Sequence, residues 1–430
     1  MELKRIASAR TGDFYYRGRH ASGLEVILYP KETGRSTRVN LGTKYGSVHN
    51  CFRLEGASAE TMPEGAAHYL EHKLFESEDG DAFARFAETG ANANAYTGTE
   101  STCYVFSCTD RLYESLEILL DFVQSPYFTE ETVAKERGII GQEIRMYGDS
   151  PGWRVFFNYL QAMYHIHPVR EDTAGTLESI ARITPEHLYR CYHTFYHLSR
   201  MILVVAGRFE VQKVTALCDR MLRYVPSPKV ELIFPREPET VVRPFVEESL
   251  SVAMPVFHFG YKCSGAPRRE ADLAAMGVLL SILASDASPL FCRLLDEGLI
   301  NESSFSYQYF EGSGYATVIF GGESRDPRQA ARLIREEIAR VKARGIPEEA
   351  FQWAKRSLYG DCVASLNQAA GIANWVMDFA FQDQELFAYI DALAELTIEQ
   401  AEEKLEEFQD GRSVLSVVWP EKITEKDEIQ

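Results

Sequence analysis

The chain is short of positive charge, and this shortage excludes one class of partner. Its 430 residues carry 45 Lys and Arg against 63 Asp and Glu, which gives a net charge of −18. No basic cluster is long enough to follow a phosphate backbone. Nucleic acid is therefore not expected as a partner.

Long apolar runs and paired cysteines are also missing. Residues 1–6 have no apolar core of signal-peptide length, and no apolar run approaches the roughly 18 residues that span a bilayer. The eight cysteines include no Cys-x-x-Cys pair, which is typical of reduced and mostly buried side chains. Cys103 and Cys108 flank a strand pattern and could approach one another, but nothing requires it. A cytoplasmic protein without a membrane span is expected.

One five-residue segment carries the pattern of a metal site. His68, Glu71 and His72 form the sequence His-x-x-Glu-His, and on a helix all three project from one face. Two neutral imidazoles one turn apart can share a zinc ion, and the carboxylate between them can act as a base on the attacking water. Pro63 and Glu64 suit the first turn of this helix. The pattern favours a catalytic or structural metal over a pair of surface histidines.

A third ligand must come from elsewhere, and a second predicted helix offers it. Residues 130–147 are typical of a helix opened by Thr129. Glu136 and Glu143 lie seven residues apart on it, close to two turns, so both carboxylates face the same way. One could ligate the metal while the other accepts a hydrogen bond from a ligand or from the water. Without the histidine motif, a solvated helix face would be the simpler interpretation.

Together these residues resemble the insulinase/pitrilysin family of zinc metallopeptidases, the inverzincins, and in particular its half-length, processing-peptidase-like bacterial branch. Glu143 follows His72 by 71 residues, as the second member of a Glu-x6-Glu pair. The resemblance covers nearly the whole chain and includes residues 90–97, 167–168, 175–180 and 195–207. It implies that His68, His72 and Glu143 bind zinc, that Glu71 is the general base, and that Glu136 supports the site.

The same resemblance implies how a substrate is held. In the family, the strand that matches Asn94 and Ala95 lies beside the zinc and adds an extended peptide to its free edge. The resemblance also implies an enclosed chamber formed by two such chains, which admits short, unstructured peptides. A turn or bulge residue is the alternative interpretation of Asn94.

A duplication organises the chain. The stretch from Thr184 through Phe195 to a strand at 201–205 recurs from Thr397 through Phe408 to 414–418, at a constant spacing of 213 residues. Such self-similarity predicts two homologous domains, 1–225 and 246–430, joined by a proline-rich connector at 226–245. Strand-like runs alternate with amphipathic helices in each copy, which predicts an α+β fold: mainly antiparallel sheets covered by helices. Only the first copy carries the zinc motif.

The second copy departs from the family pattern. The family carries Leu-Phe-x-x-Leu-Arg-Glu-x-x-Gly-Leu-x-Tyr, whose arginine and tyrosine help to bind substrate and to steady the tetrahedral intermediate. Residues 290–301 match this stretch, but Leu295 occupies the arginine position. Arg293 is out of register, and the nearest tyrosines are Tyr307 and Tyr309. We therefore hypothesise that a homologous partner supplies the missing pair in a heterodimer; a homodimer is the alternative assembly.

Three functions follow from these observations. The preferred one is a zinc metalloendopeptidase that cleaves short peptides together with a homologous subunit. The first alternative is a noncatalytic scaffold or assembly subunit, although retention of Glu71 between two ligands argues against it. The second is a maturation protease for one dedicated peptide. The pairs His193/His197 and His165/His167 are interpreted as structural, because neither has an intervening carboxylate or an evident partner.

Overall fold

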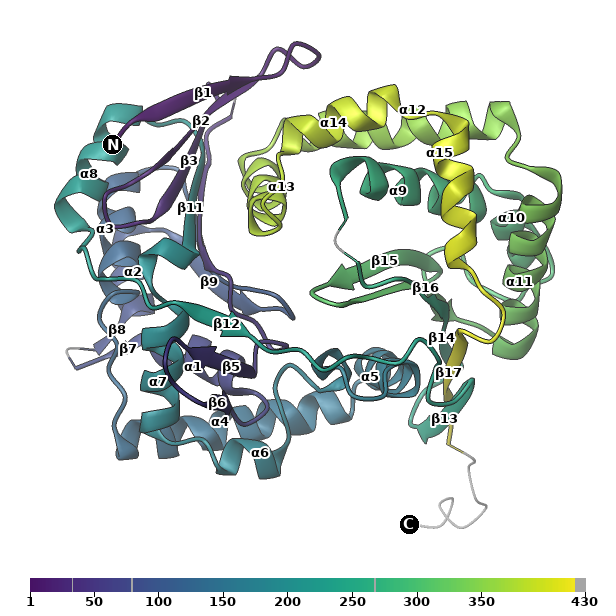
Figure 1. Ribbon diagram of the computed structural model, residues 1–430, viewed down its shortest axis with the longest axis horizontal. Coiled ribbons are helices and arrows are strands. Elements are labelled where there is room, and N and C mark those ends of the chain that lie inside the picture. Colours follow the sequence, from purple (N-terminus) through teal and green to yellow (C-terminus); the bar gives the residue numbers. More distant parts are fainter. Residues whose placement is uncertain (33, 79, 267, 422–430) are drawn as a thin grey trace. The chain divides into compact units, whose positions relative to one another are not determined.

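The structure is a computed structural model that describes residues 1–32, 34–78, 80–266 and 268–421 (Figure 1). The chain forms two compact units. The first unit contains Met1–Ile144, Glu171–Phe234 and Tyr359–Asp391. The second contains Arg145–Arg170, Pro235–Leu358 and the described residues from Ala392 onward.

The first unit is built on a seven-stranded sheet with the order β1-β2-β3-β11-β4-β10-β9. Its central strand β11 reads Met-Ile-Leu-Val-Val-Ala-Gly and is buried throughout, as expected of a strand covered on both faces. Only β3 and β11 pair in parallel, and the other neighbours are antiparallel. The strands are β1 Leu3–Ala7, β2 Phe14–Arg19, β3 Glu25–Pro30, β4 Thr37–Thr43, β9 Asn92–Thr97, β10 Thr102–Cys108 and β11 Met201–Gly207.

Helices cover both faces of this sheet. One face forms the main core, in which Val39, Leu41, Tyr104 and Phe106 pack with α1, α2, α3, α7 and α8. On the opposite face, Asn374 of α13 bonds to Asn40 of β4 at 2.9 Å. The helices of this unit are α1 Ala66–Leu74, α2 Ala82–Thr89, α3 Leu112–Phe122, α4 Glu130–Gly148, α6 Leu177–Ala181, α7 Pro185–Phe195, α8 Val211–Met221, α13 Ala369–Phe381 and the first part of α14 Leu386–Glu395. The unit also contains two small sheets. One has the order β12-β5-β6, with β5 Cys51–Leu54, β6 Ala59–Thr61 and β12 Val230–Leu232, and the other pairs β7 Glu76–Ser77 with β8 Gly80–Asp81.

The second unit repeats this plan with five strands in the order β13-β17-β14-β16-β15. Its helix α5 packs against β14 and β17. The strands are β13 Phe245–Leu250, β14 Val256–Lys262, β15 Ser306–Gly312, β16 Tyr315–Glu323 and β17 Ser413–Pro420. The helices are α5 Pro151–Met163, α9 Glu270–Ala284, α10 Pro289–Asp296, α11 Pro327–Arg344, most of α12 Glu348–Ser365, and α15 Ile398–Glu403.

The two sheets have equivalent topology, which confirms the predicted pair of homologous α+β domains. Strands β3-β11-β4-β10-β9 correspond in order and direction to β13-β17-β14-β16-β15, including one parallel pair in each sheet. The repeated threonines have the same local role. Thr184 and Thr397 each accept a hydrogen bond from a backbone N–H at the start of a helix, in a capping box.

The compact units differ from the division by sequence in two places. Helix α5, before residue 225, packs in the second unit, and α13, after residue 246, packs in the first. The connector also lies within the units. Its β12 pairs with β5, and the Glu237 carboxylate accepts hydrogen bonds from Lys262 Nζ at 2.6 Å and from three backbone N–H groups at residues 165–167.

One apolar stretch corrects the expectation that no run approaches membrane-spanning length. Residues Glu270–Asp296 reach a mean hydropathy of 1.6 over a window of spanning length, and 67% of that window is buried inside the protein. The stretch is divided into α9 and α10 by residues 285–288, and α9 has only 15 residues. A core helix passes the same test of length and composition.

Candidate metal centre

The first histidine motif lies on α1, where the sequence predicted a helix. The helix begins at Ala66 rather than at Pro63, because Gly65 takes a left-handed conformation with φ of 84°. A Cβ at Gly65 would lie 2.5 Å from the carbonyl oxygen of Ala174, so only glycine fits this turn. His68 and Glu71 are almost completely buried, and His72 is partly buried.

Helix α4 brings the predicted third ligand to these histidines. Glu143 Oε2 lies 3.7 Å from His68 Nε2 and 3.4 Å from His72 Nε2. One donor atom from each of His68, His72 and Glu143 lies within 4.8 Å of the others. Ligands of a tetrahedral zinc ion at about 2.0–2.1 Å would lie roughly 3.3 Å apart, so the arrangement fits one ion. A His2Glu set is also a known catalytic combination that leaves the fourth position open.

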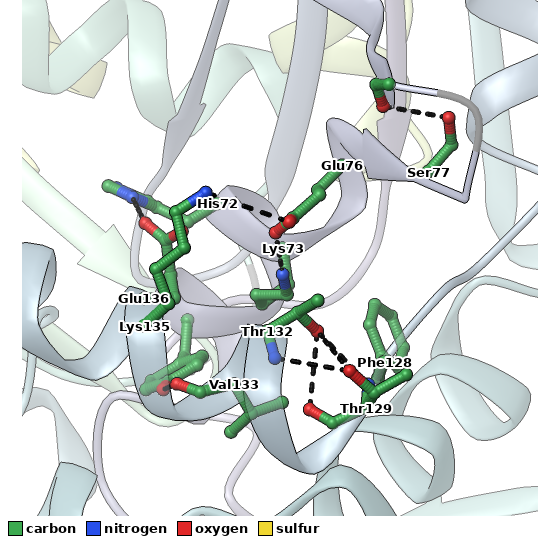
Figure 2. A network of polar contacts seen from close by, with 12 residues as sticks. His72, Lys73, Glu76, Ser77, Phe128, Thr129, Thr132, Val133, Lys135 and Glu136 are labelled. Carbon is green, nitrogen blue, oxygen red and sulfur yellow. Dashed lines mark hydrogen bonds and ion pairs between the residues drawn. The ribbon is translucent and has the colours of Figure 1, made fainter.

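Glu136 contacts a histidine rather than joining the ligand group. Its Oε1 lies 3.1 Å from His72 Nδ1 (Figure 2). An ionised carboxylate only accepts hydrogen bonds, so Nδ1 carries a hydrogen, and in the neutral imidazole Nε2 is then the nitrogen with a lone pair for a metal. Within the described part of the chain, His68 Nδ1 is buried without a hydrogen-bond partner. The contact with Glu136 thus fixes the orientation of the His72 ring.

Glu71 lies beside the ligands but outside their group. Thr97 Oγ1 of β9 donates a hydrogen bond of 3.1 Å to its Oε2. Desolvation by burial raises the pKa of Glu71 to about 7, against the opposing effects of His72 and Thr97. A carboxyl group whose pKa lies near neutrality is suited to accept and return a proton. Thr97 lies in the segment matched to the family, but nothing in the sequence alone assigned it to Glu71.

The pKa values of the two histidines are shifted in opposite directions. Desolvation, followed by the charge of His72, lowers the pKa of His68 to about 4, so His68 is neutral at pH 7. For His72, burial opposes the charged form, but the hydrogen bond to Glu136 and the charges of Glu71, Glu143 and Glu136 outweigh it and raise the pKa. Protons therefore compete with a metal more strongly at His72 than at His68.

This difference predicts how acid affects zinc binding. We expect the affinity for added zinc to weaken on acidification from above pH 6.5, the ordinary pKa of histidine, because protons compete for His72. One competing proton gives a slope of about tenfold per pH unit. Chelator competition between about pH 5.5 and 8 measures it. An affinity that stays constant over this range would show that His72 is already neutral.

Strand β9 carries the predicted substrate residues Asn94 and Ala95. It lies at the end of the seven-stranded sheet and, among described residues, pairs only with β10. Asn94 is exposed, and its Oδ1 accepts the backbone N–H of Ala95 at 2.9 Å. The strand is regular here, without the turn or bulge considered for Asn94. Its outer edge therefore has the geometry that strand addition requires.

The stretch that departs from the family pattern lies in the second unit. Leu295 stands on α10, and Arg293 pairs on the helix surface with Glu297 at 2.9 Å and Glu336 at 3.3 Å. The hydroxyl of Tyr309 accepts a hydrogen bond of 2.8 Å from Arg268 Nε. Arg293 and the hydroxyl of Tyr309 are therefore already engaged within this unit.

The other histidines have structural contacts. His197 Nε2 lies 2.7 Å from the carbonyl oxygen of Val225, and His167 Nε2 lies 2.9 Å from that of Ser313. His193 is exposed and stacks on Tyr189. All eight cysteines are free, and Cys103 and Cys108 lie at the two ends of β10 without a disulfide. His68, His72 and Glu143 are the one metal-ligand group among the described residues.

A His-x-x-Glu-His motif on one helix and a glutamate on another, in a duplicated α+β chain, is the pattern of the inverzincin metallopeptidases. The pattern of the insulinase family, Peptidase family M16, matches residues 54–177. That of the Peptidase M16 inactive domain matches residues 182–358. The chain belongs to the insulinase family, peptidase family M16.

Relatives support this assignment along the whole chain. The protein named uncharacterized zinc protease YmfH of Bacillus subtilis is 36% identical over 413 residues, which cover 94% of this chain and 96% of that protein. The crystal structure of a putative M16-like peptidase from Alicyclobacillus acidocaldarius has a TM-score of 0.91 and 36% identity, covering 98% of this chain and 99% of that one. A protease from Helicobacter pylori, at 20% identity and a TM-score of 0.82 over 95% of this chain and all of its own, shares the fold.

Proposed function

We propose that the protein is a zinc-dependent endopeptidase that cleaves short, unstructured peptides. One observation carries this proposal: three ligand atoms from His68, His72 and Glu143 converge, while Glu71 stays beside them outside the ligand group. A structural zinc site is normally closed by four protein ligands, whereas a catalytic site keeps one position open and a base nearby.

Three protein side chains contribute to the proposed reaction beside the metal ligands. Bound zinc supplies Lewis acidity, which activates water and polarises a carbonyl group. Glu71 accepts the proton of the attacking water and returns it to the leaving amine. Thr97 holds Glu71 by a hydrogen bond, and Glu136 holds His72 so that Nε2 faces the ligand group. The chemistry thus requires Glu71 to change protonation while Glu136 remains an acceptor.

Substrate recognition rests on the free edge of β9. A peptide that adds to this edge uses its backbone N–H and C=O groups, so it must be extended and unfolded at the point of cleavage. Asn94 and Ala95 lie at the middle of this edge. Backbone recognition of this kind makes little demand on side chains, which fits turnover of varied short peptides.

A homologous subunit in a heterodimer completes the site in this proposal; a homodimer is the alternative assembly, in which the second copy would carry the same Leu295. Leu295 stands where the family has arginine, and Arg293 is paired with Glu297 and Glu336. The partner would supply the arginine and tyrosine that stabilise the transition state. The eight free cysteines are consistent with a reducing, cytoplasmic setting for such an assembly.

We expect the chain alone to be a poor peptidase. Loss of a transition-state donor costs about 10² to 10³ in kcat, so adding the partner should raise turnover of a quenched fluorescent peptide by that factor. The partner to test is a homologous M16 subunit of the same organism that retains the arginine and tyrosine. The same partner with its arginine replaced by leucine is the control. Full activity of the chain alone, unchanged by the partner, would contradict this role.

A further inference from the structure

A buried histidine organises the loop between β4 and β5. The side chain of His49 is buried, and its ring packs against the rings of Tyr45 and Phe234. Its Nδ1 accepts the backbone N–H of Gly46 at 3.0 Å, and its own backbone N–H donates to the carbonyl oxygen of Gly46 at 3.1 Å. An imidazole nitrogen that accepts a hydrogen bond carries no hydrogen, so the ring hydrogen lies on Nε2. His49 thus closes a turn within this loop and keeps one donor for another partner.

That donor joins the loop to the turn between β9 and β10. Nε2 of His49 lies 3.3 Å from Oε2 of Glu100, which accepts its hydrogen. The backbone makes two more contacts, because the N–H groups of residues 47–48 donate to the carbonyl oxygens of residues 98–99, both at 3.1 Å. The loop and the turn are therefore held together by one side-chain contact and two backbone hydrogen bonds.

The loop also contacts β10 and the core of the unit. The hydroxyl of Thr102, at the start of β10, donates to the carbonyl oxygen of Tyr45 at 2.8 Å. The Tyr45 ring stacks on the buried ring of Phe195, with 4.1 Å between the ring centroids. Gly46 approaches the turn so closely that a Cβ there would clash with the carbonyl oxygen of Thr99. The loop is thus anchored in the core and fits directly against the turn.

The strand that enters this turn carries the residue that holds the proposed general base. Thr97 is the last residue of β9, and its Oγ1 donates to Oε2 of Glu71 at 3.1 Å. Thr97 pairs in register with Thr102, so the two ends of the turn are fixed to each other. The metal-ligand group lies on α1 and α4 and includes no residue of the loop or the turn. The loop therefore contacts the support of the base and not the ligands.

We propose that His49 is a positioning residue for the general base: it holds the loop against the turn, and the turn sets where Thr97 holds Glu71. This inference rests on the proposed function, because it requires Glu71 to be the base. A general base acts only within hydrogen-bond reach of the proton it removes. A displacement of about 1 Å in a catalytic group can cost about 10² in rate, even when its cause lies outside the reacting groups.

The test compares His49→Phe with His197→Phe in the full chain. Phe keeps a ring and removes both nitrogens. His197 is the matched control, because it is also buried and its two nitrogens contact Ser199 and Val225 rather than the turn. Peptide hydrolysis gives kcat and KM for the most active assembly, with or without the partner subunit. Chelator competition gives the zinc affinity, and amide hydrogen exchange at residues 47–48 is followed in the zinc-free chain.

We expect His49→Phe to lower kcat about 10- to 100-fold, while KM and the zinc affinity stay within about twofold of the wild type. Exchange at residues 47–48 should become at least about tenfold faster, because their hydrogen bonds to the turn open more often. His197→Phe should leave all four quantities within about twofold of the wild type, because its contacts lie outside the turn.

A folded His49→Phe chain with wild-type kcat would overturn the proposal. An equal fall in kcat in His197→Phe would also overturn it, and so would a parallel loss of zinc affinity, since His49 would then support the ligands. If His49→Phe fails to fold, Glu100→Ala removes the partner of Nε2 at a partly exposed position. We expect kcat to fall at least about threefold there, and a wild-type kcat would again refute the role. A wild type that binds zinc but cleaves no peptide would instead refute the proposed function.

Discussion

Replacement of Glu71 by Gln is expected to lower kcat about 10²- to 10⁴-fold while zinc binding is preserved, because a general base typically contributes this factor. Gln keeps the size of the side chain and can still contact Thr97, which lies 3.1 Å from Glu71 Oε2. It cannot accept the proton of the attacking water. Peptide hydrolysis by the assembled enzyme and zinc content of the same preparation measure the two effects.

Glu131→Gln, at the exposed start of α4, is the matched control for Glu71→Gln. It removes one carboxylate from the same unit without touching the site, and it should leave kcat unchanged. If Glu71→Gln retained full activity with normal zinc content, proton transfer would have to use another group. If it lost zinc instead, Glu71 would be a ligand rather than the base.

Replacement of Glu143 by Gln is expected to weaken zinc binding at least about 100-fold, beyond the usual effect of losing an outer hydrogen-bonding group. Glu143 is the only carboxylate in the group with His68 and His72, within the part of the chain that the structure describes. An amide oxygen is a much weaker zinc ligand than a carboxylate. Peptidase activity should fall with the zinc content and return partly when zinc is in excess.

Glu136→Gln serves as the comparison for Glu143→Gln. Glu136 contacts His72 Nδ1 but contributes no atom to the ligand group, so its loss should weaken zinc binding by a smaller factor of about 10- to 100-fold. If Glu136→Gln weakened zinc binding more than Glu143→Gln, Glu136 would be the ligand and Glu143 the outer group. If both variants bound zinc as tightly as the wild type, α4 would contribute no residue to zinc binding.

The geometry of the candidate metal site is largely predictable from the sequence, because helical spacing is a local property. Positions 68, 71 and 72 share a face on any α-helix, as do 136 and 143, and the structure brings the two helices together. The sequence predicts the start of α1 two to three residues before Ala66, because Pro63 and Glu64 suit a first turn. The left-handed φ of Gly65 depends on the nearby carbonyl of Ala174, which is distant in sequence.

Contacts between segments that are distant in the sequence could not be predicted. The duplication indicated two similar sheets, and their strand order confirms it. The sequence could not indicate that α5 packs on the second sheet and α13 on the first, since each helix is merely amphipathic. Likewise, the sequence does not indicate that Lys73 is buried. Its partner Glu76 is brought to it by the chain that follows α1. The apolar segment at 270–296 contains no single long apolar run, because Ser285, Asp286 and Ser288 interrupt it between α9 and α10.

The zinc content of the purified wild-type chain tests the account most directly. Elemental analysis after exposure to zinc and removal of excess metal is predicted to give about one zinc per chain, as a single three-residue ligand group requires. A folded chain that retains no zinc under these conditions would contradict the account. His68, His72 and Glu143 would then be vestigial, and the chain would serve as a noncatalytic subunit.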